Sequence, residues 1–407
     1  MLFQTLDDKS ECVGVYTDKR IIFDPKEFPD SISRTWDVAP YLRKMPDIEY
    51  ASLYLEGQNI DEHIPEYFKD DWVDVCKKIG AFKRSLTTSC IDTTENCFFD
   101  LVPQRFLIEY CEVKNRITDH VLKTIKRPNR YEFYKQVAFM LRDISDRRLV
   151  LDRTLLKSYL GDKKLHNQSK SILECAPCVK YNQFGTKTGR LTTKPNTFPI
   201  LTLNKSLRGV VQPSNDYFVE LDFNGAEVRT LLGILKKPQP TTDVHDFHLK
   251  NIFRSLTTRS EAKTSFFAWL YGSSQATSAG EMKELAAFYE KEKLLDKYWD
   301  GSTVVTPYKK RIENVSRHHA LNYLIQSTAA DLMLKQALKM DYLLRTRSRG
   351  SQIAFLIHDA VVIDMKKEDA PLLNLLLSLM RSTNFGNFEI NMKKGTTLGS
   401  MREFELV

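Results

Sequence analysis

The chain has 407 residues, which is long enough for two or three domains that each bury a hydrophobic core. Its 42% hydrophobic and 28% charged residues exclude a disordered protein, and no apolar run approaches the ~20 residues of a membrane span. The formal net charge of +8, from 60 basic and 52 acidic residues, permits nucleic-acid binding without requiring it.

The amino-terminal segment MLFQTLDDKS lacks the basic and then apolar layout of a signal peptide, so we expect an intracellular, cytoplasmic protein with no membrane partner. Seven cysteines, an odd number, favour reduced thiols over a disulfide framework. Cys175 and Cys178 form a single CxxC, but no second Cys or His pair stands nearby to complete a zinc site. We interpret this pair as structural or incidental.

The sequence pattern changes twice in the first half of the chain. Residues 1–103 combine strand-like runs, CVGVYTDKRIIF and YASLYLEG, with a helical stretch at 65–81, and predict a small α/β module. Residues 104–180 have a helical periodicity that is interrupted at Pro128, and their basic residues could lie along a phosphate backbone. A Gly-, Thr- and Asn-rich loop from Tyr181 then leads into the strand YFVELDF.

The second half is mostly helical over residues 227–349, apart from a hairpin predicted in VVTPYKKR. The last of these helices is expected to begin near Arg317 and to end at Gly350, a natural residue for a helix terminus. The run QIAFLIHDAVVIDM then predicts two strands joined by a tight turn at His358 and Asp359, before a final helix and a short tail.

One predicted helix carries two cations before two aromatic rings on the same face. These residues, spaced four apart, are Arg259, Lys263, Phe267 and Tyr271. Each i to i+4 step advances about 400°, so the side chains drift by only about 120° in total before the expected helix end at Gly272. Such a stripe fits a nucleoside triphosphate, with the phosphates at its cationic end. From this segment alone, a surface helix with a half-buried aromatic edge is an equal alternative.

Two acidic residues lie within apolar runs, at positions where a carboxylate does not help the packing of the fold. Asp222 closes a mostly apolar strand, and Asp359 lies at the tip of an apolar hairpin. A buried carboxylate is costly unless a cation compensates its charge, so the two positions predict a shared divalent-metal site. Two Mg²⁺ ions held by carboxylates and substrate phosphates would support phosphoryl transfer. Alternatively, Asp222 caps a turn and Asp359 supports a tight turn.

From about Tyr181 to the carboxyl terminus the chain resembles the family A DNA polymerases in four segments that follow the family's order. The first, TGRL at 188–191, is similar to a segment whose arginine, here Arg190, approaches the primer terminus and the incoming nucleotide. The second, DFNGAEVR from Asp222, resembles motif A. It implies that Asp222 and the backbone carbonyl of Phe223 bind metal, and that Glu227 is a steric gate against a ribose 2′-OH.

The third segment is the cation and aromatic stripe, which resembles the fingers helix of motif B. The resemblance implies that Arg259 and Lys263 bind the triphosphate, that Phe267 contacts the sugar, and that Tyr271 contacts the nascent base pair. Lys263 is also the candidate that neutralises the departing pyrophosphate.

The fourth segment combines NxxxQSTAAD from Asn322 with His358-Asp359, which resembles motif C. The resemblance implies that Asn322 and Gln326 read the minor groove of the primer-template, where hydrogen-bonding groups can test pair shape without reading sequence. It makes Asp359 the second metal ligand and places His358 near the primer end.

Several residues depart from the family pattern. Motif C usually reads HDE, and Ala360 replaces its glutamate; Leu356 and His318 also occupy positions where the family commonly has polar or basic residues. Gly225 and Ala226 replace bulkier residues of motif A. These changes bear on duplex binding and fidelity more than on the chemical step.

Length is the largest departure. About 30 residues separate Asp152 from Tyr181, where the family has a long helical thumb, so we expect a reduced thumb. The first hundred residues are too few for the proofreading exonuclease, and a lone Asp47-x-Glu49 is interpreted as incidental. We therefore expect a compact enzyme without 3′-5′ proofreading, with a separate exonuclease or replisome protein as a candidate partner and a phage as a plausible source, which would place it in the host cytoplasm.

The expected fold class is α+β, a right-hand polymerase with an antiparallel-sheet palm, helical fingers, a reduced helical thumb and a small N-terminal α/β module. The expected domains are the module at 1–103, the thumb-like region at 104–180, the palm at 181–235 and 317–407, and the fingers at 236–316. The expected activity is template-directed DNA synthesis from dNTPs on a primer-template with two Mg²⁺ ions, for which Mn²⁺ is a candidate substitute. A single-subunit RNA polymerase and a catalytically silent nucleic-acid-binding subunit remain alternatives.

Overall fold

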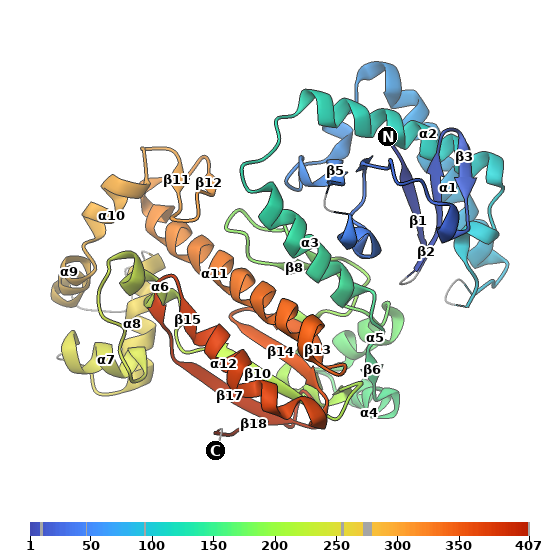
Figure 1. Ribbon diagram of the computed structural model, residues 1–407. Helices are drawn as coiled ribbons and strands as arrows, with labels where there is room; N and C mark the ends of the chain where they lie inside the picture. The colour runs from blue at the N-terminus through green and yellow to red at the C-terminus, as the bar shows by residue number, and fades with distance from the viewer. Residues whose placement is uncertain (9–10, 46, 93–94, 254–255, 272–278, 406–407) are drawn as a thin grey trace. The chain divides into compact units, whose positions relative to one another are not determined.

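A computed structural model describes residues 1–8, 11–45, 47–92, 95–253, 256–271 and 279–405. The chain divides into two compact units, Met1–Arg147 and Arg148–Val407. Figure 1 traces the elements of both units along the chain. All seven cysteines are free thiols. Among the described residues, no helix is both long enough and apolar enough to cross a membrane.

The first unit combines a small antiparallel sheet with three long helices. The sheet has the order β1-β2-β3, and a two-residue parallel ladder joins β4 to β5. The strands are β1 Gln4–Asp8, β2 Glu11–Thr17, β3 Arg20–Ile22, β4 Arg34–Thr35 and β5 Glu49–Tyr50. The helices are α1 Glu66–Thr88, α2 Gln104–Thr124 and α3 Tyr131–Ser145.

The run YASLYLEG was predicted as a strand, and this prediction is wrong. Only Glu49–Tyr50 is extended, and Ala51–Leu53 forms a 3-10 turn. Nearly every residue from Tyr50 to Leu55 is buried, a pattern that a compact turn surrounded by helices satisfies and a one-sided strand does not.

The first unit extends beyond the expected boundary at residue 103. Helix α2 buries the stripe Leu107, Cys111, Ile117 and Val121 and packs against β1 and β4. Helix α3 packs against the 3-10 turns of the same unit. The segment expected to form the thumb, residues 104–180, is therefore divided at Arg147, because the apolar faces of its first two helices pack within the N-terminal unit.

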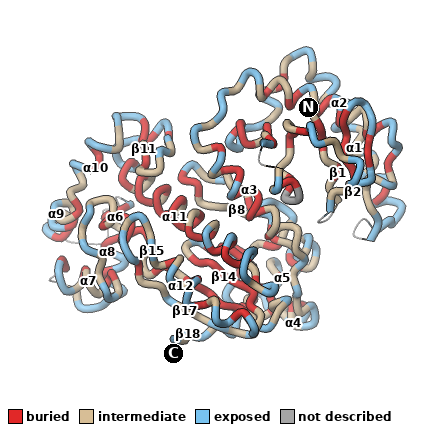
Figure 2. The backbone as a smooth tube through the Cα atoms, viewed as in Figure 1, coloured by how far each residue is buried: buried red, intermediate tan, exposed pale blue. Residues whose placement is uncertain are grey.

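The second unit is built on a five-stranded antiparallel sheet of order β13-β14-β10-β17-β18. Its strands are β10 Tyr217–Phe223, β13 Gln352–Ile357, β14 Ala360–Met365, β17 Ile390–Gly395 and β18 Arg402–Glu403. Every residue of β14 is buried, and Figure 2 shows this strand and much of α11 as buried backbone. The predicted hairpin of β13 and β14 is confirmed, with His358 and Asp359 forming its turn.

Two helices pack against this sheet. Helix α11, Arg317–Arg347, contacts β13, and α12, Leu373–Arg381, contacts α11 and β17 (Figure 1). Helix α11 stops two residues short of the expected position, at the cap Ser348, and Gly350 follows with a φ of 133°.

A helical layer follows β10 in the chain. Its helices are α6 Ala226–Ile234, α7 Val244–Asn251, α8 Arg259–Tyr271, α9 Ala279–Phe288 and α10 Lys291–Tyr298. The aromatic residues Phe266, Trp269 and Tyr289 form the centre of its core. The hairpin predicted in VVTPYKKR is confirmed as β11 Val304–Val305 and β12 Arg311–Ile312. Gly272, the expected end of α8, lies outside the described residues.

Short elements complete the second unit. They are β6 Val150–Leu151, α4 Arg153–Ser158, α5 His166–Glu174, β7 Tyr181–Asn182, β8 Thr192–Thr193, β9 Val211–Gln212, β15 Ser382–Thr383 and β16 Gly386–Asn387. The pair of β7 and β8 brackets the loop that carries Arg190.

Candidate active site

Asp222 and Asp359 lie side by side at one end of the central sheet. Strands β10 and β14 are antiparallel partners, and Asp222 pairs with Ala360, the residue after Asp359. The backbone N–H of Phe223 donates a hydrogen bond of 3.3 Å to the carbonyl oxygen of Asp359. Two acids that are distant in sequence are therefore brought together by strand pairing.

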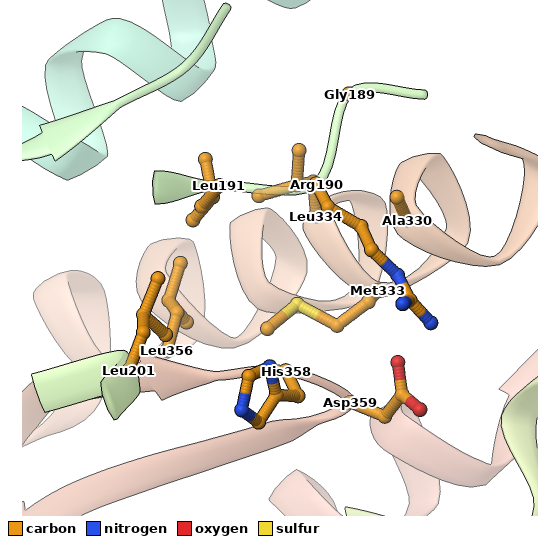
Figure 3. A pocket seen from close by; sticks show the side chains of 10 residues that line it. All are labelled: Gly189, Arg190, Leu191, Leu201, Ala330, Met333, Leu334, Leu356, His358 and Asp359. Carbon is orange, nitrogen blue, oxygen red and sulfur yellow. The ribbon is translucent and has the colours of Figure 1, made fainter. Parts of the chain in front are cut away.

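The turn between β13 and β14 presents Asp359 to a pocket. Its first residue, His358, has a φ of 54°, a left-handed conformation in which histidine is found more often than most residues. Figure 3 shows the Asp359 carboxylate facing the guanidinium of Arg190. The pocket is lined by Gly189, Arg190, Leu191, Leu201, Ala330, Met333, Leu334, Leu356, His358 and Asp359.

Burial is the largest cause of a raised pKa in both carboxyl groups. Burial first, and then the charges of Asp359 and Glu220, raise the pKa of Asp222 to about 6, against the opposing effects of Lys393 and a hydrogen bond from Asn391. Burial also raises the pKa of Asp359, which the charge of Arg190 partly offsets. A nearby cation would favour the ionised form of both side chains, a property that metal ligands share.

Arg190 and Glu227 form an ion pair beside the two acids. Glu227 is the second residue of α6, and only 4% of its side chain is exposed, whereas 41% of the Arg190 side chain is exposed. Burial raises the pKa of Glu227, and the charge of Arg190 opposes this shift. Arg190 therefore faces two carboxylates, those of Glu227 and Asp359, from the loop between β7 and β8.

The carboxyl end of helix α8 contacts Glu227. The hydroxyl of Tyr271 donates to Glu227 Oε2 at 3.4 Å, and Gln326 Nε2 of α11 donates to the Tyr271 hydroxyl at 3.5 Å. The ring of Phe267 stacks on that of Tyr271, with centroids 5.7 Å apart and an interplanar angle of 21°. The aromatic half of the predicted stripe thus lies at the site.

The cationic half of the stripe lies at the other end of α8. Arg259 Nη2 donates to Asp243 Oδ2 at 2.6 Å, and Lys263 is exposed. The ring centroid of His245 lies 5.9 Å from that of Phe267. Burial lowers the pKa of His245 to about 4, and the charge of Lys263 contributes to this shift. Within the described residues, no hydrogen bond or ion pair joins Arg259, Lys263 or Asn322 to Asp222 or Asp359.

Asp243 and Tyr181 are two site residues that the sequence did not predict. Asp243 stands at the start of a helix, three residues before Asp246, in a pattern typical of a helix cap. This pattern could have predicted the helix, but not the bond of Asp243 to Arg259. The hydroxyl of Tyr181 both donates to the carbonyl of Leu356 at 2.8 Å and accepts from its N–H at 3.0 Å. This contact joins segments far apart in sequence, and no local pattern encodes it.

The acid pair fits a magnesium site better than a metal site made wholly of side chains. No group of three or more His, Cys, Asp or Glu residues in the described part of the chain could hold a metal ion. Mg²⁺ is typically bound through one or two carboxylates together with substrate phosphates and water. Asp222 and Asp359, with their raised pKa values and oxygen-only donor set, match that requirement.

Comparison with known proteins agrees with this arrangement. No protein-family model matches the chain. It is 24% identical over 267 residues to DNA polymerase I of Aquifex aeolicus (strain VF5), a match that covers 56% of this chain and 46% of that enzyme. The chain thus spans about half the length of this curated relative.

The fold is also similar to that of a solved polymerase. The POL domain of Pol1 from M. smegmatis, in complex with DNA primer-template and dNTP, superposes with a TM-score of 0.59 at 14% identity, covering 73% of this chain and 76% of that one. The predicted α+β polymerase fold class is confirmed. The sequence similarity and the shared fold together support a likeness of this chain to the family A DNA polymerases.

Proposed function

We propose that this chain is a template-directed DNA polymerase that adds deoxynucleotides to a primer 3′-OH. The observation that carries the proposal is the adjacency of Asp222 and Asp359 at the end of paired strands. Arg190, Glu227 and Tyr271 form one hydrogen-bonded group, and Arg190 faces Asp359 of the acid pair (Figure 3). Similarity to a POL domain bound to primer-template and dNTP supports DNA and dNTPs as partners.

The proposed chemistry needs divalent metal. Asp222, Asp359 and the carbonyl of Phe223 would hold Mg²⁺, or Mn²⁺ in its place, which would activate the 3′-OH and stabilise the leaving pyrophosphate. In this proposal Arg259 and Lys263 bind the triphosphate, and Lys263 neutralises the departing charge. Their exposed positions on α8 leave them accessible to an incoming anion.

The remaining residues would position the primer, the template and the sugar. Phe267 and Tyr271 form a stacked aromatic surface, which would contact sugar and base, and the buried Glu227 would act as the gate against a 2′-OH. Gln326, Asn322 and His358 are proposed contacts of the primer-template. The bond from Gln326 to Tyr271 supports a link between the minor-groove face of α11 and the nucleotide pocket.

Primer extension with dNTPs and Mg²⁺ tests the proposal. We expect Asp222→Asn and Asp359→Asn to lower the extension rate by at least about 10³-fold while primer-template binding persists. Asp216→Asn is the matched control, because Asp216 lies just before the same strand and its exposed carboxylate contacts Lys367, through a hydrogen bond from the backbone N–H and an ion pair with Nζ at 4.0 Å. An equal loss of DNA binding in the two site variants would indicate a folding role instead.

The compact N-terminal unit motivates the further proposal that the chain lacks 3′-5′ proofreading, with an exonuclease or another replisome protein acting separately. A primer with a mismatched 3′ end should remain untrimmed by the pure protein in Mg²⁺. Metal-dependent trimming that survives Asp359→Asn would overturn this part of the proposal, because it would require a second active site.

Two other functions compete with this one. A single-subunit RNA polymerase is disfavoured by Glu227, because that class generally has a small residue at this position, whereas here a large and buried side chain stands. A silent nucleic-acid-binding subunit is disfavoured by the acid pair, since a binder has no use for two buried carboxylates facing phosphate. Extension with dNTPs, extension with rNTPs only, and binding without extension distinguish the three.

A further inference from the structure

We propose that Tyr181 is a positioning residue that fixes the Asp359 turn through a single hydroxyl group. The kinetic part of this inference rests on the proposed polymerase function. Its structural part does not. Tyr181 is 6% exposed and lies in β7, paired with Thr193 of β8.

The geometry of the hairpin explains why a hydroxyl is needed there. Strand β13 is an edge of the sheet, with β14 as its neighbour on one side. The turn of His358 and Asp359 is closed by the pair Ile357 and Ala360, and Leu356 comes next along the strand. In an antiparallel pair, hydrogen-bonded and non-bonded positions alternate, so the N–H and C=O of Leu356 point away from β14.

No further strand is present on that side to take up these two groups within the described sheet. Leu356 is only 1% exposed, so water cannot satisfy them readily. The Tyr181 hydroxyl does so alone, since it donates to the carbonyl at 2.8 Å and accepts from the N–H at 3.0 Å. One oxygen atom therefore replaces a neighbouring strand, three residues before Asp359.

Tyr181 also affects how the Arg190 loop lies against the Asp359 turn. Strands β7 and β8 bracket the loop that carries Arg190, and Arg190 faces Asp359 and pairs with Glu227. Tyr181 thus ties the Arg190 loop to the Asp359 turn and sets the position of one against the other. Loss of its hydroxyl leaves buried N–H and C=O groups unpaired, which favours local movement of the turn.

The test compares Tyr181→Phe with Tyr131→Phe. Tyr131 is a matched control in the other compact unit, because it is 2% exposed and its hydroxyl accepts a hydrogen bond of 2.8 Å from the backbone N–H of Tyr50. We expect Tyr181→Phe to lower kcat for extension by about tenfold or more, with the KM for dNTP changed by less than about twofold. The triphosphate-binding cations of α8 are untouched by this change.

Amide exchange supplies a readout that does not depend on activity. In Tyr181→Phe, the amides of the segment 355–360 should exchange at least about tenfold faster than in the wild type, while Tyr131→Phe leaves them unchanged. Unchanged exchange and unchanged kcat in Tyr181→Phe would overturn the inference. If the wild type itself does not extend primers, the proposed function fails while the exchange result still decides the role of Tyr181.

If Tyr181→Phe does not fold, amide exchange in the wild type alone tests the proposal. The Leu356 amide should then exchange at least about 100-fold more slowly than in an unstructured peptide, although it lies on the outer side of an edge strand. Exchange at the rate of a solvated edge amide would contradict the hydrogen bond and sink the proposal.

Discussion

Asp243 holds Arg259 by a hydrogen bond of 2.6 Å between Oδ2 and Nη2, and the same oxygen accepts from Asn224 Nδ2 at 2.9 Å. Its other oxygen accepts from the backbone N–H of His245 and of Asp246 and so caps α7. One carboxylate therefore joins the turn after Asp222 to the first residue of α8. The start of α8 is anchored to the turn after the strand of Asp222 through this group.

We predict that the stabilising effect of Asp243 depends on pH. Burial alone would raise the pKa of Asp243, but hydrogen bonds from Arg259, Asn224 and two backbone amides hold it far below its ordinary value. For a folded-state pKa that is depressed, stabilisation is full above the unfolded value of ~3.9 and is lost as the pH falls through the folded value. Urea unfolding of wild type and Asp243→Asn should show a difference at pH 7 that shrinks below about pH 4.

Asp243→Ala provides the second arm of this experiment. Asparagine can still cap a helix, whereas alanine cannot, so Asp243→Ala should cost roughly 1–2 kcal/mol of unfolding free energy and exceed the loss in Asp243→Asn. A pH-independent difference between wild type and Asp243→Asn would show that the charge of Asp243 contributes nothing.

Asp222 should destabilise the metal-free protein at neutral pH. Burial, followed by the charges of Asp359 and Glu220, raises its folded-state pKa to about 6. The folded protein therefore binds this proton more tightly than the unfolded chain, so the ionised group costs stability above about pH 6, and this cost disappears below the unfolded pKa of ~3.9. We expect Asp222→Asn to be more stable than the wild type by on the order of 1–2 kcal/mol at pH 7.5 in EDTA.

Urea unfolding at pH 7.5 and pH 4, with EDTA or with Mg²⁺, measures this effect. The advantage of Asp222→Asn should fall toward zero at pH 4, and Mg²⁺ should stabilise the wild type more than the variant. If Asp222→Asn is less stable than the wild type at every pH, the carboxylate of Asp222 has a structural role and does not serve as a cation ligand.

Glu227 should select deoxynucleotides over ribonucleotides. Its buried side chain is held by Arg190 and by the hydroxyl of Tyr271, which fixes its carboxylate beside the aromatic end of α8. Glu227→Ala removes this volume, and we expect the preference for dNTP over rNTP, measured as a ratio of kcat/KM values, to fall by about 10–100-fold. Glu227→Gln keeps the side-chain size and should retain most of the preference. Unchanged selectivity in Glu227→Ala would exclude the gate assignment.

Local sequence patterns predicted the central part of the site. The apolar runs around Asp222 and Asp359 predicted strands β10, β13 and β14, and the pairing of β10 with β14 was what brought the two acids together. The four-residue spacing from Arg259 to Tyr271 predicted α8, whose aromatic end lies at Glu227. These features depend on short-range periodicity, which a single sequence displays directly.

Features that depend on distant partners were not predictable in this way. The run YASLYLEG had the apolar character of a strand, but its residues are buried in a 3-10 turn by helices that follow much later in the chain. Helix α2 had a clear apolar face, but the sequence did not indicate that β1 and β4 would cover it. The hydroxyl of Tyr181 and the carboxylate of Asp243 likewise gain their roles only from long-range contacts.

Gly225, which departs from the bulkier residue of the family pattern, illustrates the same dependence on tertiary contacts. Its φ of 66° lies in the left-handed region, which strongly favours glycine, and it directly precedes α6. A Cβ atom at this position would lie 2.4 Å from Cγ2 of Val244, a fully buried residue at the start of α7. The turn after Asp222 therefore requires glycine for two independent reasons.

Gly225→Ala should consequently destabilise the protein. The left-handed backbone costs alanine roughly 1–2 kcal/mol, and displacing a buried side chain adds roughly 1–3 kcal/mol, so we expect a loss of about 2–5 kcal/mol in the urea unfolding free energy. Gly161→Ala is the control, because a Cβ atom there meets no atom within 4 Å, and its effect should stay within about 0.5 kcal/mol. If both variants unfold at the same urea concentration, Val244 does not pack over the Asp222 turn, and the anchoring of α7 and α8 to the acid strand through this turn must be abandoned.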